Sequence, residues 1–181
     1  RSLTNISVPD SVTYIGDYVF SFCVSLTSIS MPNNITEISN SLFLYCSSLT
    51  NITIPSSVIA IYPKAFYCCS ELTSVTIPNS VTYIGTQAFQ CCSKLTSIIL
   101  SDNIKEISEL LFRDCISLTN ITIPGSVTTI GTRSFQDCSK LTSVTIPESV
   151  SSIYFYVFSG CYKLTSITIP DNITTIYAGL F

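Results

Sequence analysis

The sequence predicts a solenoid of eight 23-residue coils, with a parallel sheet on the concave side and short helical turns on the convex side. Three observations lead to this fold. Two β-branched or aliphatic positions alternate like a strand and end at a proline in seven coils, and a Phe-x-x-Cys motif closes seven coils. A leucine opens every coil at a constant spacing of 23 residues, at Leu3, Leu26, Leu49, Leu72, Leu95, Leu118, Leu141 and Leu164.

The first half of each coil is expected to be a strand followed by a tight turn. In the coil that begins at Leu72, Val75 and Ile77 point inward because strand side chains alternate, and Pro78 ends the strand because proline has no N–H to donate. Serine or asparagine then occupies the turn, where its side chain can bond nearby backbone; Asn34 and Asn172 fall in this register.

The second half of each coil is expected to carry a short helical turn. Possible N-cap residues precede the phenylalanine, at Asp17, Asn40, Thr86 and Thr132. So short a turn is stable only when neighbouring coils hold it. The predicted core contains the leucine, isoleucine and valine rows, the phenylalanine row from Phe20 to Phe181, and the seven in-register cysteines Cys23, Cys46, Cys69, Cys92, Cys115, Cys138 and Cys161.

Residues 72–94, LTSVTIPNSVTYIGTQAFQCCSK, resemble a BspA-like leucine-rich repeat, and the resemblance extends over nearly the whole chain. It implies a leucine-rich-repeat solenoid of the α/β type, on an extracellular or cell-surface protein that takes part in adhesion. The departures are local. Ser101 stands in place of the proline, and other residues replace the glycine at Ser39, Tyr62, Ser108, Tyr154 and Tyr177.

Residues 1–181 are expected to form a single leucine-rich-repeat domain and to be a fragment of a longer repeat array, because the chain begins at Arg1 and stops inside a coil. No apolar stretch approaches the roughly 18 residues of a membrane helix, so we expect no membrane insertion by this segment. A net charge of −3 argues against nucleic acid as a partner.

The sequence offers little chemistry for catalysis. Its lack of histidine removes Ser-His-Asp and Cys-His mechanisms and mixed Cys/His zinc sites. Glu106 and Glu109 could form an acid/base pair, but Lys105 and Arg113 lie beside them, which favours a solvated charged rim. We therefore expect no enzyme activity, no cofactor and no metal site.

The outward strand residues form two rows of Ser, Thr and Asn, interrupted by one apolar residue, Ile99. Repeat proteins commonly bind ligands on this face, although Thr also simply favours strands. The ligand-binding residues expected on this concave face are Ser74, Thr76, Ser97, Ile99, Asn120 and Thr122.

Two functions remain open. The first is a non-enzymatic adhesion or protein-binding module whose ligand is a host protein, a matrix protein or another cell. The alternative is a structural spacer or filament-forming array that self-associates through the solenoid ends, because neither end carries the polar capping repeat that solenoids need.

Two kinds of modification are also expected if the chain is secreted. Cys68 and Cys91 occupy equivalent positions on neighbouring coils, within reach of a disulfide. Otherwise Phe22, Tyr45 and these two cysteines form an apolar strip for contact with another chain. Glycosylation sequons place acceptor asparagines outward on the strands at Asn5, Asn51 and Asn120.

Overall fold

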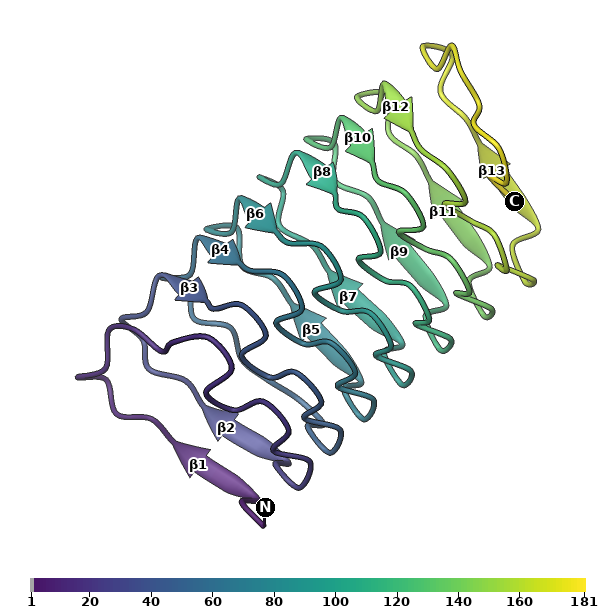
Figure 1. The fold of residues 1–181 in the computed structure, drawn as a ribbon. Coiled ribbons are helices and arrows are strands. Elements are labelled where there is room, and N and C mark those ends of the chain that lie inside the picture. Colours follow the sequence, from purple (N-terminus) through teal and green to yellow (C-terminus); the bar gives the residue numbers. More distant parts are fainter. Residues whose placement is uncertain (1) are drawn as a thin grey trace.

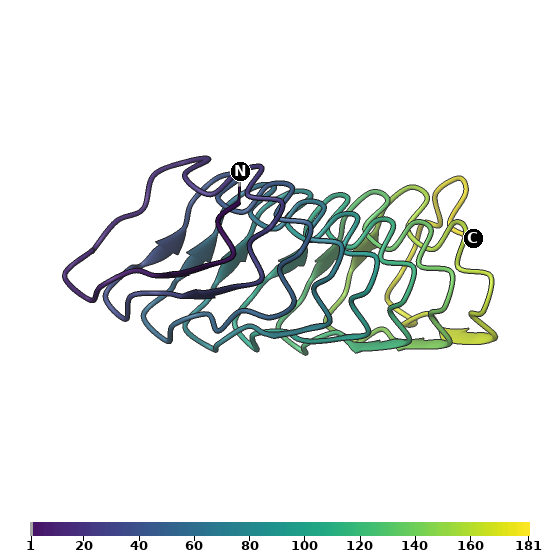
Figure 2. The same cartoon turned by 90° about the horizontal axis from the view of Figure 1, so that it is seen from below.

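The computed structural model describes residues 2–181 as a solenoid of seven complete 23-residue coils and part of an eighth. The coils stack one behind the next, and the two termini lie at opposite ends of the stack (Figures 1 and 2). The predicted fold class is confirmed. Each coil contacts the next through residues 23 positions apart, as the register Asn5↔Ser28 illustrates.

Seven of the eight predicted strands are present, and they run parallel to one another. Each ends two residues before the proline position, because the proline cannot donate to the ladder. We call this surface the long-strand face; its strands are β1 (Asn5–Ser7), β2 (Ser28–Ser30), β5 (Ser74–Thr76), β7 (Ser97–Ile99), β9 (Asn120–Thr122), β11 (Ser143–Thr145) and β13 (Ser166–Thr168).

Two-residue strands form two further parallel sheets of three strands each along another side of the solenoid (Figure 1), with no pairing between the strand that ends at Ile84 and the one that ends at Ile107. The sequence did not predict these sheets, because two residues are too short to show strand alternation. In each strand the second residue is a buried aliphatic. These strands are β3 (Glu37–Ile38), β4 (Ala60–Ile61), β6 (Tyr83–Ile84), β8 (Glu106–Ile107), β10 (Thr129–Ile130) and β12 (Ser152–Ile153).

The long-strand ladder is interrupted at two places. Residues 51–53 form no strand between β2 and β5, and β7 pairs with β5 but not with β9. At the end of β7, Ser101 takes the place of the proline and is fully buried. Its Oγ donates to the carbonyl of Val81 at 2.6 Å and accepts from the N–H of Asn103 at 3.1 Å. These bonds hold the turn that proline fixes in other coils.

The expected helical turns do not form: no helix occurs in residues 2–181. Each complete coil instead has two residues with positive φ, such as Lys64 (57°) and Cys68 (57°). Between them, alternate N–H groups donate to the next coil, for example Phe66 N–H to the Ala88 carbonyl at 2.8 Å. These donors pair between coils rather than within a turn, so a helix is not required to satisfy them.

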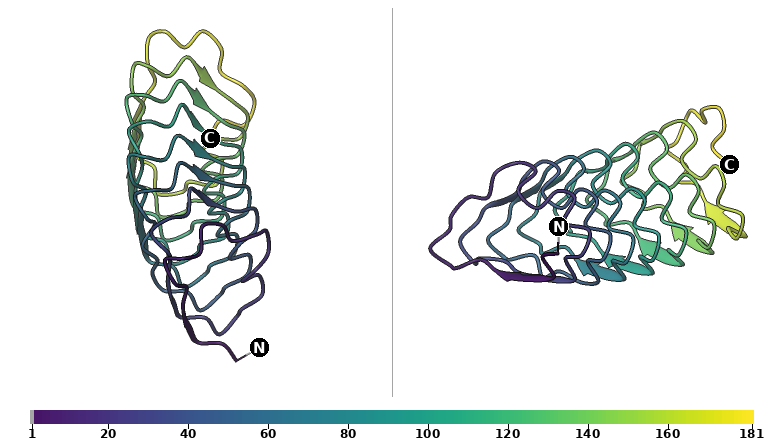
Figure 3. Two further views of the ribbon diagram at one scale, coloured as in Figure 1. Left: turned by 90° about the vertical axis from the view of Figure 1, so that its left-hand side faces the viewer. Right: turned by 60° about the horizontal axis from the view of Figure 1, so that its bottom comes forward.

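The core is one continuous column of stacked side chains. It lies inside the stacked coils, which Figure 3 shows from two further directions. The phenylalanine rings stack coil on coil; Phe66 and Phe89 have centroids 5.1 Å apart and an interplanar angle of 10°. All seven in-register cysteines are buried, as predicted. The terminal members of the rows differ from the prediction. Phe181 is 64% exposed and Leu3 is 38% exposed, because neither is covered by a further coil.

Candidate functional site

The six residues expected to bind a ligand all lie exposed on the long-strand face. The strand register places Ser74 beside Ser97 and Thr76 beside Ile99. Ile99 is 64% exposed, whereas the aliphatic residue before it, Ile98, is buried. The strand alternation therefore aims one large apolar side chain into solvent among small hydroxyls.

The structure divides the six residues between two hollows, and each hollow lies at an interruption of the ladder. Ser97, Ile99, Asn120 and Thr122 line a hollow of about 280 Å³ at the gap between β7 and β9. Ser74 and Thr76 instead line a second hollow of about 360 Å³, together with residues of the irregular segment 51–54. The predicted site is therefore one principal hollow and a neighbouring one.

We call the hollow at the β7–β9 gap the Ile99 hollow. Its rim also includes Asp102 and Pro124, which the sequence analysis did not assign to the site because both follow the strand. The backbone N–H of Asp102 donates to Asn79 Oδ1 at 3.0 Å, and Asn79 Nδ2 donates to Asp102 Oδ2 at 3.2 Å. Asp102 is thus fixed in place as a carboxylate next to an apolar centre.

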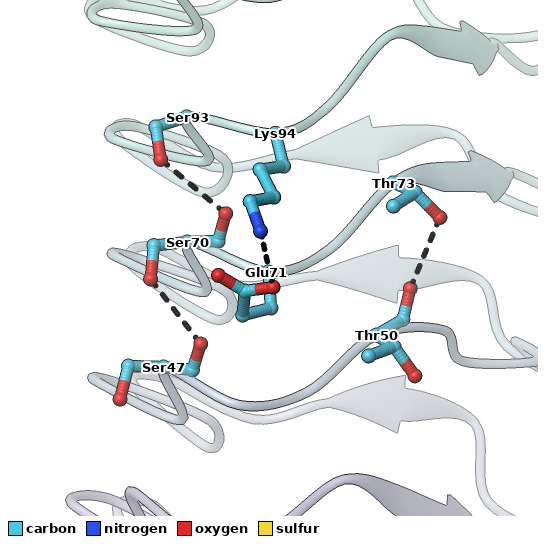
Figure 4. Close-up of polar contacts among 7 residues, drawn as sticks. All are labelled: Ser47, Thr50, Ser70, Glu71, Thr73, Ser93 and Lys94. Carbon is cyan, nitrogen blue, oxygen red and sulfur yellow. Dashed lines mark hydrogen bonds and ion pairs between the residues drawn. The ribbon is translucent and has the colours of Figure 1, made fainter.

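Many of the surface hydroxyls serve the stack itself. Thr73 Oγ1 donates to the carbonyl of Thr50 at 3.3 Å, one coil earlier (Figure 4). Ser70 and Ser93 make the same kind of bond, at 3.2 and 3.3 Å, and Lys94 pairs with Glu71 at 2.7 Å. The threonines that follow the opening leucine therefore have a structural role, unlike the strand residues that line the hollows.

The turn-register asparagines also link coils. Asn34 Nδ2 donates to the carbonyl of Asp10 at 2.8 Å, and Asn172 Nδ2 donates to that of Glu148 at 3.2 Å. The expected bonding to backbone is thus present, but its acceptor belongs to the preceding coil. The sequon asparagines Asn5, Asn51 and Asn120 are exposed on the long-strand face, and their glycosylation stays a prediction.

Cys68 and Cys91 are half-buried free thiols on neighbouring coils, both with positive φ. Cys91 Sγ donates to Asp114 Oδ2 at 3.7 Å. Burial, together with the neighbouring Cys68 thiol, raises the pKa of Cys91 to about 12. These thiols are therefore poor nucleophiles at neutral pH, and the disulfide between them stays a prediction.

Among residues 2–181, the structure adds no catalytic constellation to those considered from the sequence. Glu106 and Glu109 are both exposed and border an open groove with Thr86, Thr132 and Tyr154. Within residues 2–181, no three His, Cys, Asp or Glu side chains come together in a way that could hold a metal ion. The same residues contain no helix long and apolar enough to cross a membrane.

Comparison with protein families and comparison with solved structures both identify leucine-rich repeats. A model of the BspA type leucine rich repeat region, in six copies, matches residues 1–119 and 59–181. A search of curated protein sequences found no match.

Among solved structures, a leucine-rich repeat protein of Treponema pallidum is 29% identical with a TM-score of 0.86, covering 91% of this chain and 79% of that one. One from Bacteroides ovatus is 28% identical with a TM-score of 0.80, covering 98% of this chain and 52% of that one. One from Eubacterium ventriosum is 28% identical with a TM-score of 0.77, covering 96% of this chain and 56% of that one. The chain thus spans about half the length of the last two.

Proposed function

Because this chain belongs to the BspA-type leucine-rich-repeat family, we propose that it is a non-enzymatic adhesion module that binds a protein ligand through the Ile99 hollow. Leucine-rich repeats are generally protein-interaction modules. The ligand is a host protein, a matrix protein or a protein on another cell, and the module acts at the cell surface or after secretion.

The exposure of Ile99 at a break in the ladder is the observation that supports this proposal most. Elsewhere in its row the residue is Ser or Thr, and at the other interruption of the ladder, residues 51–53, the corresponding residue is Thr53. The hollow beside Ile99 can receive an apolar side chain of a partner, and the exposed Asp102 carboxylate can accept a hydrogen bond at the rim. An apolar anchor in a pocket with a polar rim is the usual arrangement of a binding hot spot.

The proposal is tested by measuring binding of the purified domain to a panel of soluble extracellular matrix proteins by surface plasmon resonance. For any protein that binds, Ile99→Asp should weaken affinity tenfold or more, roughly 1.4 kcal/mol or more. Ile99→Thr, which restores the residue common in this row, should weaken affinity while leaving the fold intact. Ile59 is also exposed but lies on a different part of the coil, so that Ile59→Thr is the matched control.

Unchanged affinity in both Ile99 variants would move the binding site away from this hollow. The same result would follow if Ile59→Thr weakened binding as much as Ile99→Thr. Labelling of intact producing cells with an antibody against this domain tests the location. Labelling only after the cells are permeabilised would contradict a surface position.

A structural spacer or filament is the second candidate, and the first coil supports it. That coil leaves an apolar hollow of about 410 Å³ lined by residues such as Ile6, Val8, Val12 and Phe20. The last coil likewise leaves Phe181 exposed. Association of one domain's last coil with another's first coil would cover both surfaces. Sedimentation that gives a monomer at high concentration would count against this candidate.

A further inference from the structure

A further hollow, lined by tyrosines, lies on the turn side of the early coils, away from the long-strand face. It has a volume of about 270 Å³. Its residues are Tyr18, Ser41, Leu44, Tyr45, Lys64, Tyr67 and Gln87. We call it the tyrosine hollow. Four of these residues, Tyr18, Ser41, Lys64 and Gln87, occupy one register in successive coils, and all four have positive φ.

The rings of the tyrosine hollow are positioned by aromatic neighbours and are partly exposed to solvent. Tyr45 stacks on Phe22 with centroids 5.1 Å apart, and meets Tyr67 edge to face at 5.6 Å. Even so, Tyr45 remains 39% exposed and Tyr18 remains 52% exposed. A tyrosine ring offers an apolar face and a hydroxyl at its edge, so such rings bind partners that are apolar on one face and polar around the rim.

Besides the tyrosine hydroxyls, the hollow offers the ammonium of Lys64 and the amide of Gln87. The hydroxyl of Ser41 is buried and donates to Asn40 Oδ1 at 3.3 Å. Gln87 is oriented by a 2.7 Å bond from its Nε2 to Gln90 Oε1, which leaves its own side-chain oxygen free to accept. Lys64 is exposed, and among residues 2–181 the ion pairs are Lys94–Glu71 and Arg113–Asp114. The Lys64 ammonium therefore faces no carboxylate of the described chain and can pair with one from a ligand.

The later coils do not repeat this surface. In the same registers they carry charged residues that are already engaged: Arg113 lies 3.4 Å from Asp114, and Arg133 lies 5.3 Å over the ring of Tyr156. The positive-φ residues form two rows at 23-residue intervals, one that begins at Tyr18 and one that begins at Phe22. The last members of these two rows are glycines, Gly179 and Gly160 respectively. The tyrosine hollow is thus a feature of coils one to four and not a consequence of the repeat.

We propose that the tyrosine hollow binds a carboxylated sugar ring, that is, a pyranose bearing a carboxylate. The C–H face of the ring would pack on the tyrosines, the carboxylate would pair with Lys64, and a ring hydroxyl would bond the side-chain oxygen of Gln87. A few polar groups around an apolar wall are typical of small-ligand sites. At about 270 Å³ the hollow lies just below the range of roughly 300–1,000 Å³ that is usual for small-ligand pockets, which suits a single sugar ring.

The positive-φ backbone provides variants that remove rings without disturbing the fold. Glycine adopts positive φ without strain, and Gly179 already occupies the register of Tyr18 while Gly160 occupies that of Tyr45. Tyr18→Gly and Tyr45→Gly therefore delete a wall of the hollow. Lys64→Gln removes the charge, and Gln87 shows that glutamine is accepted in that register. Tyr156→Gly deletes a ring in the Tyr18 register outside the hollow and is the matched control.

The experiment is saturation-transfer NMR and calorimetry with 3′-sialyllactose and with glucuronic acid, each compared with its neutral counterpart, lactose or glucose. We expect the acidic sugars to bind at least tenfold more tightly than the neutral ones. Tyr18→Gly and Tyr45→Gly should each lose tenfold or more in affinity for the acidic sugars. Lys64→Gln should abolish the preference for the acidic sugar, while Tyr156→Gly and Ile99→Thr should bind like the unchanged domain.

Three results would overturn the proposal. The first is no transfer to either acidic sugar at millimolar concentration. The second is equal affinity for acidic and neutral sugars in the unchanged domain. The third is binding of an acidic peptide in place of the sugars, which would assign the hollow to a protein segment. Because Ile99→Thr is included, loss of protein binding and loss of sugar binding are measured separately.

Discussion

The thiol of Cys92 donates to the carbonyl oxygen of Phe66 in the preceding coil at 3.3 Å. The same carbonyl accepts the N–H of Cys69 at 3.1 Å, so it is bonded both within its own coil and from the next. Both residues are fully buried. From Cys46 to Cys161 the cysteine row is therefore a ladder of protonated thiols, each donating a weak hydrogen bond to the coil before it.

This ladder predicts a loss of stability at alkaline pH. Burial raises the pKa of Cys92 well above its ordinary value, and raises that of Cys46 to about 12. The folded state then keeps protons that the unfolded chain releases above about pH 8.5, so the stabilisation is complete below that pH and is lost as the pH rises toward the folded value. By pH 10 each such thiol should lose about 2 kcal/mol of its contribution to stability.

Urea unfolding at pH 7 and pH 10 checks this prediction, with Cys92→Ala as the control. The variant lacks one raised thiol, so its free energy of unfolding should fall between the two pH values by about 2 kcal/mol less than that of the unchanged domain. All other titrations are common to both proteins. An equal fall in the two proteins would contradict the proposed ladder.

Truncation of the phenylalanine column should be strongly destabilising. Phe89 is fully buried and stacks between Phe66 at 5.1 Å and Phe112 at 6.0 Å. Phe89→Ala should lower the free energy of unfolding by about 3–5 kcal/mol, because it leaves a cavity that two rigid neighbours cannot fill. Tyr162→Ala is the control, since Tyr162 is 85% exposed, and its effect should fall within about 0.5 kcal/mol of zero. A loss below 1 kcal/mol for Phe89→Ala would contradict a rigid column.

Two glycines in different registers of the coil should respond differently to alanine. A Cβ on Gly85 would lie 2.5 Å from the backbone nitrogen of Pro63, whereas a Cβ on Gly125 meets nothing within 4 Å. Gly85→Ala should therefore cost about 1–3 kcal/mol through overpacking, and Gly125→Ala should change stability little. Thermal or urea unfolding of the two variants side by side measures the difference. Similar stabilities would show that the coils can separate at Gly85 without cost.

The sequence predicted the period, the long-strand face and the buried rows, because each depends on a pattern that recurs in every coil. Leu72, Val75 and Phe89 are buried for the reason that the periodicity indicates. The turns were predicted wrongly, since Asp17 and Asn40 resemble N-caps but their coils continue into residues with positive φ. Nothing in the residue types indicated this: tyrosine, lysine and glutamine at Tyr18, Lys64 and Gln87 are unusual in that conformation.

Less of the candidate site than of the fold could be predicted from the sequence. Ile99 was found because it departs from its row, and the structure places it at a hollow. The break between β7 and β9 that forms the hollow has no sequence signal of its own, because Asn120 and Thr122 are typical of the row. The tyrosine hollow was missed because its residues come from three registers of the coil, which are brought together only by the positive-φ turns.

The last prediction concerns the bond between Cys68 and Cys91. Both thiols are half-buried, and their residues follow each other in one register of neighbouring coils. Their raised thiol pKa values, which burial causes in both, make the oxidation slow at neutral pH and faster as the pH rises. In an oxidising compartment we expect these two thiols to form the bridge, while the fully buried row, such as Cys69 and Cys92, stays reduced.

Mass spectrometry of a non-reduced digest decides whether the bridge forms. The domain is incubated with oxidised and reduced glutathione at pH 8.5, alkylated and digested, and Cys91→Ser is the control. A linked pair of peptides carrying Cys68 and Cys91, absent from the control, supports the bridge. Alkylated thiols at both positions would reject it, and would leave Phe22, Tyr45 and the two cysteines as an apolar strip for contact with another chain. A linked Cys69–Cys92 pair would contradict the burial argument, because those thiols are enclosed on all sides in the folded stack.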